Sequence, residues 1–314
     1  MSSLKLHKNH FSNTLQSILH CFEGKMLNIK EMHVKSILSK SNLPVCDYSA
    51  NPYTGCTFAC KYCYACFMKR FSNHAENWGE FLDVKYWEPL KNTQKYANKE
   101  LFVGSVTDPY NPQERIYQRT KALLEELKDS EIKLSIATKS DLILRDLELI
   151  KTFKNPRVSF SINTLDENFR RDMDRAVPIK KRLEAMKILY KEGIITTCFI
   201  SPIFPSITDV EAIINEVKDY CHFIWLENLN LRGSYKSIIM EYIRTKHPQL
   251  LPLYQEIYTQ GKMDYWQWLD SKLKEFVEGR GLKYVYNDDT LAPCSKPIVV
   301  NFFYHEKIKK NAKA

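Results

Sequence analysis

The chain has 314 residues, with 46 Lys and Arg against 37 Asp and Glu, and it contains nine cysteines and nine glycines. A length of about 300 residues allows one large domain or two small ones with a substantial core. A hydrophobic content of 44% with 26% charged residues excludes a disordered chain, a collagen and a disulfide-stapled miniprotein. No apolar run approaches the roughly 18 residues of a membrane span, and the start lacks the apolar segment of a secretory signal. We therefore expect a cytoplasmic protein without a membrane partner, whose cysteines bind metal or act as thiols.

The net charge of +9 is concentrated at the two ends of the chain. Residues 1–40 hold six lysines and two glutamates, and residues 307–314 hold four lysines and no acid. The remaining 266 residues are therefore nearly neutral, at +1. Basic ends favour a nucleic acid as partner, whereas the neutral body gives that interpretation little support.

Short runs rich in β-branched or aromatic residues alternate with amphipathic segments along the chain. The expected strands are 46–50, 101–105, 133–137, 158–162, 194–200 and 223–226. The expected helices are 120–127, 142–153, 179–190 and 210–220, with Asp141 as the N-cap of the second and Thr208 or Asp209 as that of the fourth. This alternation predicts a parallel α/β sheet, either a barrel or doubly wound, with its chemistry at the carboxyl ends of the strands.

After residue 233 the pattern becomes mainly helical and ends in two further β-like runs, 284–286 and 298–302. Residues 263–269 place two tryptophans and a tyrosine within about one turn of a helix. An aromatic stripe of this kind is usually part of a core, and docking of a partner is the alternative.

Four cysteines follow the first expected strand within eleven residues, in the segment Asn-Pro-Tyr-Thr-Gly-Cys-Thr-Phe-Ala-Cys-Lys-Tyr-Cys-Tyr-Ala-Cys (51–66). The spacing Cys56-x3-Cys60-x2-Cys63 lets one compact loop ligate three irons of a cubane and leaves the fourth iron open. A structural four-thiolate site that also uses Cys66, holding zinc or a closed iron–sulfur cluster, is the alternative; a disulfide pair is weaker. Zinc ribbons, however, place their ligands in two well-separated CxxC pairs, and the sequence has no second pair.

The Cys-x3-Cys-x2-Cys motif with an aromatic residue before its third cysteine resembles the radical S-adenosylmethionine (SAM) superfamily. The stretch 51–65 and the segment Gly-Ser-Val-Thr-Asp-Pro-Tyr (104–110) resemble its spore photoproduct lyase-like branch, over about residues 33–232. Residues 66–70, 225–233 and 302–306 are similar to a narrower subgroup, the radical SAM mobile pair protein B type, which is encoded beside a second radical SAM protein. The resemblance implies a partial (β/α)6 TIM-type barrel in residues 46–232. It follows an N-terminal extension, 1–45, and precedes a helical C-terminal extension, 233–314, that closes its open side.

The family's chemistry implies roles for the three motif cysteines. Cys56, Cys60 and Cys63 would hold a [4Fe-4S] cluster whose open iron binds SAM. Reductive cleavage of SAM would then give a 5′-deoxyadenosyl radical that removes hydrogen from a substrate. The electron would come from a reductant such as flavodoxin or ferredoxin, and a second radical SAM protein is a further expected partner.

The lyase-like branch also implies contacts to SAM. The Gly-Gly-Glu stretch of many superfamily members is absent here, and the matching SAM contacts are instead Thr107, Lys139 and Ser161. Lysine suits a carboxylate, and hydroxyls bond either an amine or a carboxylate. The alternatives are a solvated loop lysine for Lys139 and a backbone-bonded hydroxyl for Ser161.

Further residues are expected around the substrate. Tyr62 and Tyr64 flank the last cluster cysteine, where the family's tyrosines border SAM or relay a radical; packing of the loop is the alternative for Tyr64. Glu227 is the best candidate for a substrate or ribose contact, and its alternative is an ion pair with Arg232 or a lysine.

The lyase itself carries a cysteine that returns hydrogen to its product, and that position is Val106 here. This departure disfavours the same thymine-dimer repair. Cys198 is a candidate substitute donor, with a buried inert thiol as the more common outcome. The sequence leaves three functions open: a radical SAM enzyme with an unidentified substrate, a lyase-like enzyme that repairs or modifies nucleic acid, and a non-catalytic iron–sulfur or zinc protein that binds nucleic acid. It also leaves open the roles of Cys66 and Cys294.

Overall fold

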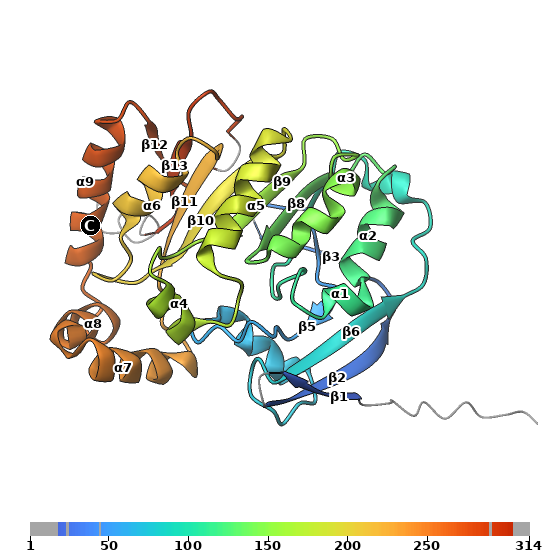
Figure 1. Ribbon diagram of the computed structural model, residues 1–314, viewed down its shortest axis with the longest axis horizontal. Helices are drawn as coiled ribbons and strands as arrows, with labels where there is room; N and C mark the ends of the chain where they lie inside the picture. Colours follow the sequence, from blue (N-terminus) through green and yellow to red (C-terminus); the bar gives the residue numbers. More distant parts are fainter. Residues whose placement is uncertain (1–17, 23–24, 44, 289–290, 304–314) are drawn as a thin grey trace, which may run out of the picture.

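The computed structural model describes residues 18–22, 25–43, 45–288 and 291–303, and a nine-stranded sheet runs through its centre (Figure 1). In spatial order its strands are β3 (Leu38–Lys40), β4 (Tyr48–Ala50), β7 (Glu100–Val103), β8 (Lys133–Thr138), β9 (Arg157–Ser161), β10 (Ile195–Ile203), β11 (Phe223–Asn228), β13 (Ile298–Asn301) and β12 (Lys283–Tyr286). Every neighbouring pair is parallel except β3 and β4.

The six strands expected from the sequence are β4, β7, β8, β9, β10 and β11, with ends that differ by up to three residues. Strands of a parallel sheet are covered on both faces, so their sequences are nearly continuous apolar runs. Short apolar runs in the sequence were therefore enough to predict these strands. The two late runs form β12 and β13 and extend the same sheet. The prediction of a parallel α/β fold is confirmed.

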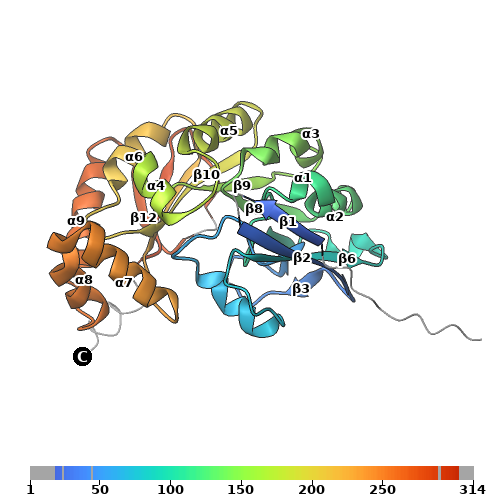
Figure 2. The same ribbon diagram turned by 60° about the horizontal axis from the view of Figure 1, so that its bottom comes forward.

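Helices cover one face of this sheet (Figures 1 and 2). They are α2 (Arg119–Leu127), α3 (Leu147–Ile150), α5 (Ile179–Lys191), α6 (Val210–Val217) and α9 (Asp264–Glu278). Asp209 caps α6 by accepting a hydrogen bond from the Ala212 amide at 2.9 Å, as expected. The expected helix 142–153 is instead a 3-10 turn, η3 (Asp141–Asp146), followed by α3. Its cap is Ser140 rather than Asp141, because the Ser140 hydroxyl accepts from the Leu142 amide.

A second, smaller sheet lies on the other side of the central one (Figure 2). Its order is β1 (Ile18–Phe22), β2 (Lys25–Val34), β6 (Phe81–Trp87) and β5 (Tyr53–Thr54), with β2 and β6 parallel. β5 ends at Gly55, whose φ is +88° and where an added Cβ would lie 2.5 Å from the Phe81 carbonyl oxygen. Only glycine fits this turn, and the turn leads directly into the cysteine motif.

Segments on both sides of the expected boundaries share sheets. β2 pairs with β6 across residue 45, and β13 pairs with β11 across residue 232. The three-part division at these residues stays a prediction. Residues 304–306 of the expected motif and the basic segment 307–314 lie outside the described residues.

The C-terminal part contributes α7 (Tyr235–Lys246), η4 (Pro248–Leu250), α8 (Leu251–Tyr258) and α9. Trp266 of α9 is buried against Phe303, whereas Trp268 is 54% exposed. The core interpretation of the aromatic stripe is therefore confirmed for Trp266 and for Tyr265, which packs partly buried against the same core, but not for Trp268. Within the described residues, no helix is both long and apolar enough to span a membrane.

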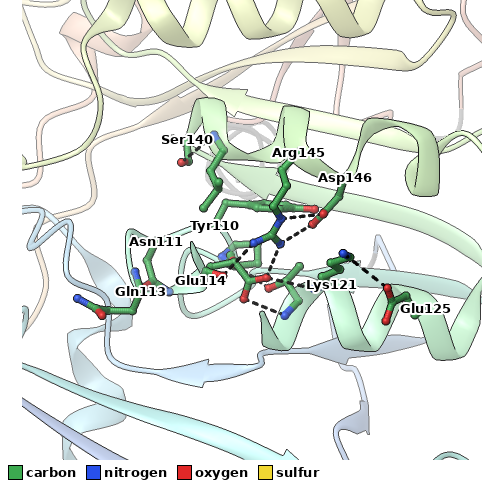
Figure 3. Close-up of polar contacts among 12 residues, drawn as sticks. Tyr110, Asn111, Gln113, Glu114, Lys121, Glu125, Ser140, Arg145 and Asp146 are labelled. Carbon is green, nitrogen blue, oxygen red and sulfur yellow. Dashed lines mark hydrogen bonds and ion pairs between the residues drawn. The ribbon is translucent and has the colours of Figure 1, made fainter. Parts of the chain in front are cut away.

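A buried carboxylate joins the two sheets (Figure 3). Glu114, in α1 (Glu114–Tyr117), is fully buried and accepts hydrogen bonds from four donors: the Tyr53 hydroxyl, the amides of Thr120 and Lys121 at the start of α2, and the Arg145 guanidinium at 2.6 Å. Arg145 also makes two hydrogen bonds to Asp146, at 2.8 and 2.7 Å. The network holds β5, and therefore the start of the cysteine motif, against α2 and η3.

Replacing Glu114 with alanine tests this network. The change leaves Arg145 without one of its two carboxylates and leaves the first amides of α2 without their acceptor. We expect the free energy of unfolding to fall by about 3–5 kcal/mol, as for other broken buried ion pairs, measured by urea denaturation. Glu125→Ala is the matched control, because Glu125 forms an exposed pair with Lys121 at 3.9 Å and such pairs contribute at most about 1 kcal/mol. Equal losses in the two variants would contradict the assignment.

Candidate active site

The cysteine motif forms a loop that runs from β5 to η1 (Tyr64–Phe71) and is held from two directions. From the β7 side, the Thr107 hydroxyl donates to the Gly55 carbonyl at 2.5 Å. From the end of α4 (Glu167–Met173), the Lys61 amide donates to the Met173 carbonyl at 2.9 Å, and the Arg175 amide donates to that of Phe58 at 2.8 Å. These bonds fix the path of the loop independently of any bound metal.

The three motif thiols lie close enough to affect one another. Burial raises the pKa of Cys56, Cys60 and Cys63, to about 11 for Cys63, and neighbouring cysteines contribute to the shift at each position. Metal binding at such thiols releases protons. In the described part of the chain, no three ligand side chains surround one point as a single metal ion requires; a cubane needs one thiolate for each of three irons.

Trp78 lies beside this loop, although nothing in the sequence marked it. Its indole nitrogen is buried and has no hydrogen-bond partner among the described residues. The indole N–H lowers the pKa of Cys63, against the larger effect of burial. The ring is fixed by an edge contact with Phe81 at 5.8 Å. An N–H directed at a ligand sulfur is one of the contacts that tune iron–sulfur clusters.

Tyr62 is anchored below the loop by a buried ion pair. Its hydroxyl donates to Asp174 at 3.0 Å, and Asp174 is paired with Arg182 at 3.1 Å. Arg182 is almost completely buried and also donates to the carbonyls of Ser161 and Val177, at 3.1 and 2.9 Å. No local pattern marked Asp174 or Arg182, because the two residues meet Tyr62 only in the folded chain. The catalytic role of Tyr62 stays a prediction.

Lys139 follows β8 and points toward the same thiols. Its backbone amide donates to Asp108 at 2.7 Å, and its ammonium lies 5.6 Å from the centroid of the Tyr62 ring. The ammonium lowers the pKa of Cys60 and Cys63. It is buried and has no hydrogen-bond partner among the described residues. A buried cation without a partner is costly, so the site suits an anionic group placed beside the cluster cysteines.

Asp108 positions that lysine and was not singled out in the sequence. It is buried and accepts from the Thr138 hydroxyl, the Lys139 amide and the Tyr110 amide at 2.7, 2.7 and 2.9 Å. Asn51 holds the other end of the segment after β7, because its side chain bonds the Ser105 hydroxyl and the Val106 amide. The two motifs that carried the family resemblance are therefore bonded to each other.

Two further polar residues, Ser161 and Asn163, lie at the carboxyl end of β9. Ser161 is partly exposed, and its carbonyl is engaged by Arg182. The side-chain nitrogen of Asn163 is buried without a partner among the described residues. The backbone carbonyl of Asn163 accepts a hydrogen bond from the Thr208 hydroxyl. β9 is the neighbour of β8, the strand that ends just before Lys139, so both residues lie at the same edge of the sheet as Lys139.

Glu227 and Tyr64 lie on the open face of the sheet. Glu227 accepts from the Ser201 hydroxyl at 2.6 Å, and burial raises its pKa although solvent reaches the side chain. Tyr64 is 60% exposed and donates to the Ser105 carbonyl. Burial also raises the pKa of Tyr64, and the nearby charge of Glu227 contributes to that shift. An ion pair between Glu227 and Arg232 does not form within the described residues.

The other cysteines lie outside this arrangement. Cys198 is fully buried in the main core beside Cys221, and burial raises its pKa. Its role as a hydrogen donor stays a prediction, as does the alternative of an inert packed thiol. Cys66 is partly buried, 4.0 Å from the Ser234 hydroxyl, and raises the pKa of Cys63. Cys294 is exposed and donates to the Lys296 carbonyl.

Replacing Arg182 with methionine tests the anchor of Tyr62. The variant keeps an unbranched side chain but removes the closest cation from buried Asp174, and we expect a loss of about 3 kcal/mol in unfolding free energy. Arg171→Met is the control, because Arg171 lies on the exposed side of α4 and surface changes usually cost within about 0.5 kcal/mol. Urea denaturation of both variants gives the comparison, and an Arg182 variant as stable as the control would show that the pair does not hold the loop.

Comparison with known proteins places these features in a family. A family model described as the radical SAM superfamily matches residues 50–217. The uncharacterized protein MJ0683 of Methanocaldococcus jannaschii is 37% identical over 224 residues, which are 71% of this chain and 85% of the relative. The uncharacterized protein Mb2609c of Mycobacterium bovis is 26% identical over 264 residues, 76% of each chain.

A solved structure shares the fold. A spore photoproduct lyase variant with bound AdoMet and dinucleoside spore photoproduct is similar with a TM-score of 0.52 at 15% identity, over 70% of this chain and 67% of its own. At that identity the likeness concerns the fold, and it confirms the partial TIM-type barrel. The family match spans more than half of the chain and includes all three motif cysteines. This protein therefore belongs to the radical SAM superfamily, whose enzymes use a [4Fe-4S] cluster and SAM.

Proposed function

We propose that this enzyme cleaves SAM reductively at the loop 55–63 and directs the resulting radical to a substrate on the open face of the sheet. The observation that carries the proposal is the buried, unpartnered ammonium of Lys139 beside the cluster cysteines. A group of that charge, at that place, matches the carboxylate of SAM. Cys56, Cys60 and Cys63 would hold the cluster.

When bound, the cluster supplies the electron that splits the sulfonium of SAM and yields the 5′-deoxyadenosyl radical. The chain's own part is to bind, orient and exclude water. The Trp78 indole N–H lowers the pKa of Cys63 and so favours its thiolate form. Asp108 holds the Lys139 backbone in place, so that the ammonium needs little reorganisation to receive a carboxylate.

The remaining predicted contacts surround the same region. We propose that Ser161 and the unpartnered amide of Asn163 bond the polar end of SAM. Thr107 already donates to Gly55, so it would contact SAM by accepting a hydrogen bond. Glu227 and Tyr64 line the open face and are proposed to contact the ribose or the substrate. Tyr62 would act through the position of the loop, since its hydroxyl is bonded to Asp174.

Thymine-dimer repair is not part of the proposal. Val106 occupies the position of the lyase's hydrogen-returning cysteine, and Cys198 is packed in the core. The basic segment that favoured nucleic acid, 307–314, lies outside the described residues. The substrate class, the reductant and a second radical SAM partner stay predictions.

Loss of one motif cysteine tests the cluster assignment. After anaerobic reconstitution, we expect about four irons per chain and release of 5′-deoxyadenosine from SAM under dithionite. Cys56→Ala should abolish that product. Cys66→Ala is the matched control, a neighbouring thiol outside the proposed ligand set, and should retain both the irons and the product. Iron analysis and chromatography measure the two quantities. Loss of the cluster in Cys66→Ala would support the four-thiolate site instead.

Replacing Lys139 with methionine tests the proposed carboxylate contact. We expect the affinity for SAM to fall about 10- to 100-fold, the range for losing a hydrogen bond between charged groups, with the iron content unchanged. Isothermal titration of the reconstituted protein with SAM measures this. Lys133→Met is the control, because Lys133 begins β8, the strand that Lys139 follows, but is exposed and paired with Glu100 at 3.0 Å. An unchanged affinity in Lys139→Met would show that SAM binds elsewhere.

A further inference from the structure

An exposed aromatic and basic surface begins at the residue that follows Cys63. Its central residues come from η1: Phe67 is 39% exposed, Phe71 is 70% exposed, and their rings meet edge to face at 6.4 Å. The Arg70 guanidinium lies 4.8 Å from the Phe71 centroid and 5.4 Å from that of Phe67. Two further cations are Lys69, in the same helix, and Lys61, two residues before Cys63. We call these five residues the η1 surface.

The fold does not need these two phenylalanines on the surface. η1 packs inward through Ala65, which is buried, and through Cys66, which packs against the hydrophobic cluster of the helical C-terminal part. Neither Phe67 nor Phe71 belongs to a hydrophobic core cluster of the described residues. Exposed aromatic rings stacked with an arginine have the composition of the energetic centre of protein interfaces.

The surface carries positive charge that the described residues do not neutralise. η1 contains no acidic residue. Lys69 donates to the Ala75 carbonyl at 3.1 Å, and Lys61 lies 5.8 Å from the centroid of the Tyr242 ring. Within the described part of the chain neither lysine, nor Arg70, forms an ion pair. Charge complementarity therefore favours an acidic partner.

The position of the η1 surface beside a proposed cluster ligand indicates that the partner supplies electrons. The proposed reaction consumes one electron for each SAM cleaved, and the electron must enter through the cluster. Cys63, a proposed cluster ligand, directly precedes the first residue of η1, so a protein docked here lies against the segment that continues from the cluster loop. Two rings and three cations make a small patch, which suits the short-lived, small interfaces of electron-transfer complexes.

We propose that the η1 surface docks an acidic one-electron donor protein of the flavodoxin or ferredoxin class. The partner's carboxylates meet Arg70, Lys69 and Lys61, and its redox group faces the cluster loop, with Phe67 and Phe71 excluding water between them. One electron leaves the reduced donor and one enters the oxidised cluster, with no change in bonds. This inference rests on the proposed function, since it requires a cluster on Cys56, Cys60 and Cys63.

The test compares a protein donor with a small one. Stopped-flow absorbance follows reduction of the reconstituted cluster by flavodoxin hydroquinone and, separately, by dithionite. For Lys69→Glu with Arg70→Glu, we expect the rate with flavodoxin to fall at least about tenfold, because opposite charges steer association. The rate with dithionite should change by less than about twofold, because a small reductant needs no docking site of this shape. The wild-type rate with flavodoxin should also fall with salt.

Two further variants complete the design. Lys180→Glu with Lys191→Glu makes the same change of charge on exposed positions of α5 and should keep both rates. Phe71→Ala removes the most exposed ring without changing charge and should slow only flavodoxin, which keeps the proposal testable if the double variant does not fold.

Three outcomes would overturn the proposal. One is a flavodoxin rate in the η1 variants equal to that of the α5 control. A second is equal slowing by dithionite, which would place the effect on the cluster itself. A third is an unchanged flavodoxin rate with lost binding of a fluorescent single-stranded oligonucleotide, which would make the η1 surface a nucleic-acid site. Failure of the wild-type protein to release 5′-deoxyadenosine with dithionite would instead count against the proposed function.

Discussion

The arrangement depends on holding three cysteines of a nine-residue loop at mutually close positions before any metal is bound. Burial and the neighbouring thiols raise the pKa of each cysteine, and the loop is held both by its own backbone hydrogen bonds, from Ala59 to Cys56 and from Cys63 to Cys60, and by contacts with the rest of the fold. The Thr107 hydroxyl donates to the start of the loop, residues at the end of α4 bond its middle, and the Tyr62 hydroxyl near its end donates to Asp174. Gly55 makes the entry turn possible because no side chain fits against Phe81.

Three buried charged side chains differ in whether other residues of the chain bond to them. Glu114 and Arg182 are each surrounded by partners: Glu114 by four donors, and Arg182 by Asp174 and two carbonyls. Their cost of burial is compensated within the chain. Lys139 is different, because its ammonium has no hydrogen-bond partner among the described residues. Among these three charges, only the Lys139 ammonium lacks hydrogen bonds to the described part of the chain. Since it lies beside the cluster cysteines, this points to a ligand that Glu114 and Arg182 do not need.

Sequence reasoning succeeded where chemistry depends on residues close together in the chain. Cys56, Cys60 and Cys63 lie within eight positions, and the six strands are short apolar runs that stay apolar in any parallel sheet. It failed or left alternatives open where the outcome depends on the folded chain. The cap of η3 is Ser140 rather than Asp141, because only the folded turn shows which side chain reaches the Leu142 amide. For Cys198 the sequence left a hydrogen donor and the more common buried thiol open, because strand alternation alone does not say which face meets the helices.

The sequence by itself determined the cluster motif, the parallel α/β class and the family, because a local spacing of thiols and a run of apolar residues carry their meaning without tertiary contacts. Only the tertiary structure decided which polar residues meet at the loop. Trp78, Asp108, Asp174 and Arg182 come from four separate segments, and nothing local distinguishes them from other tryptophans, aspartates and arginines. The physical reason is that burial and pairing give these groups their roles, and both are properties of the folded chain.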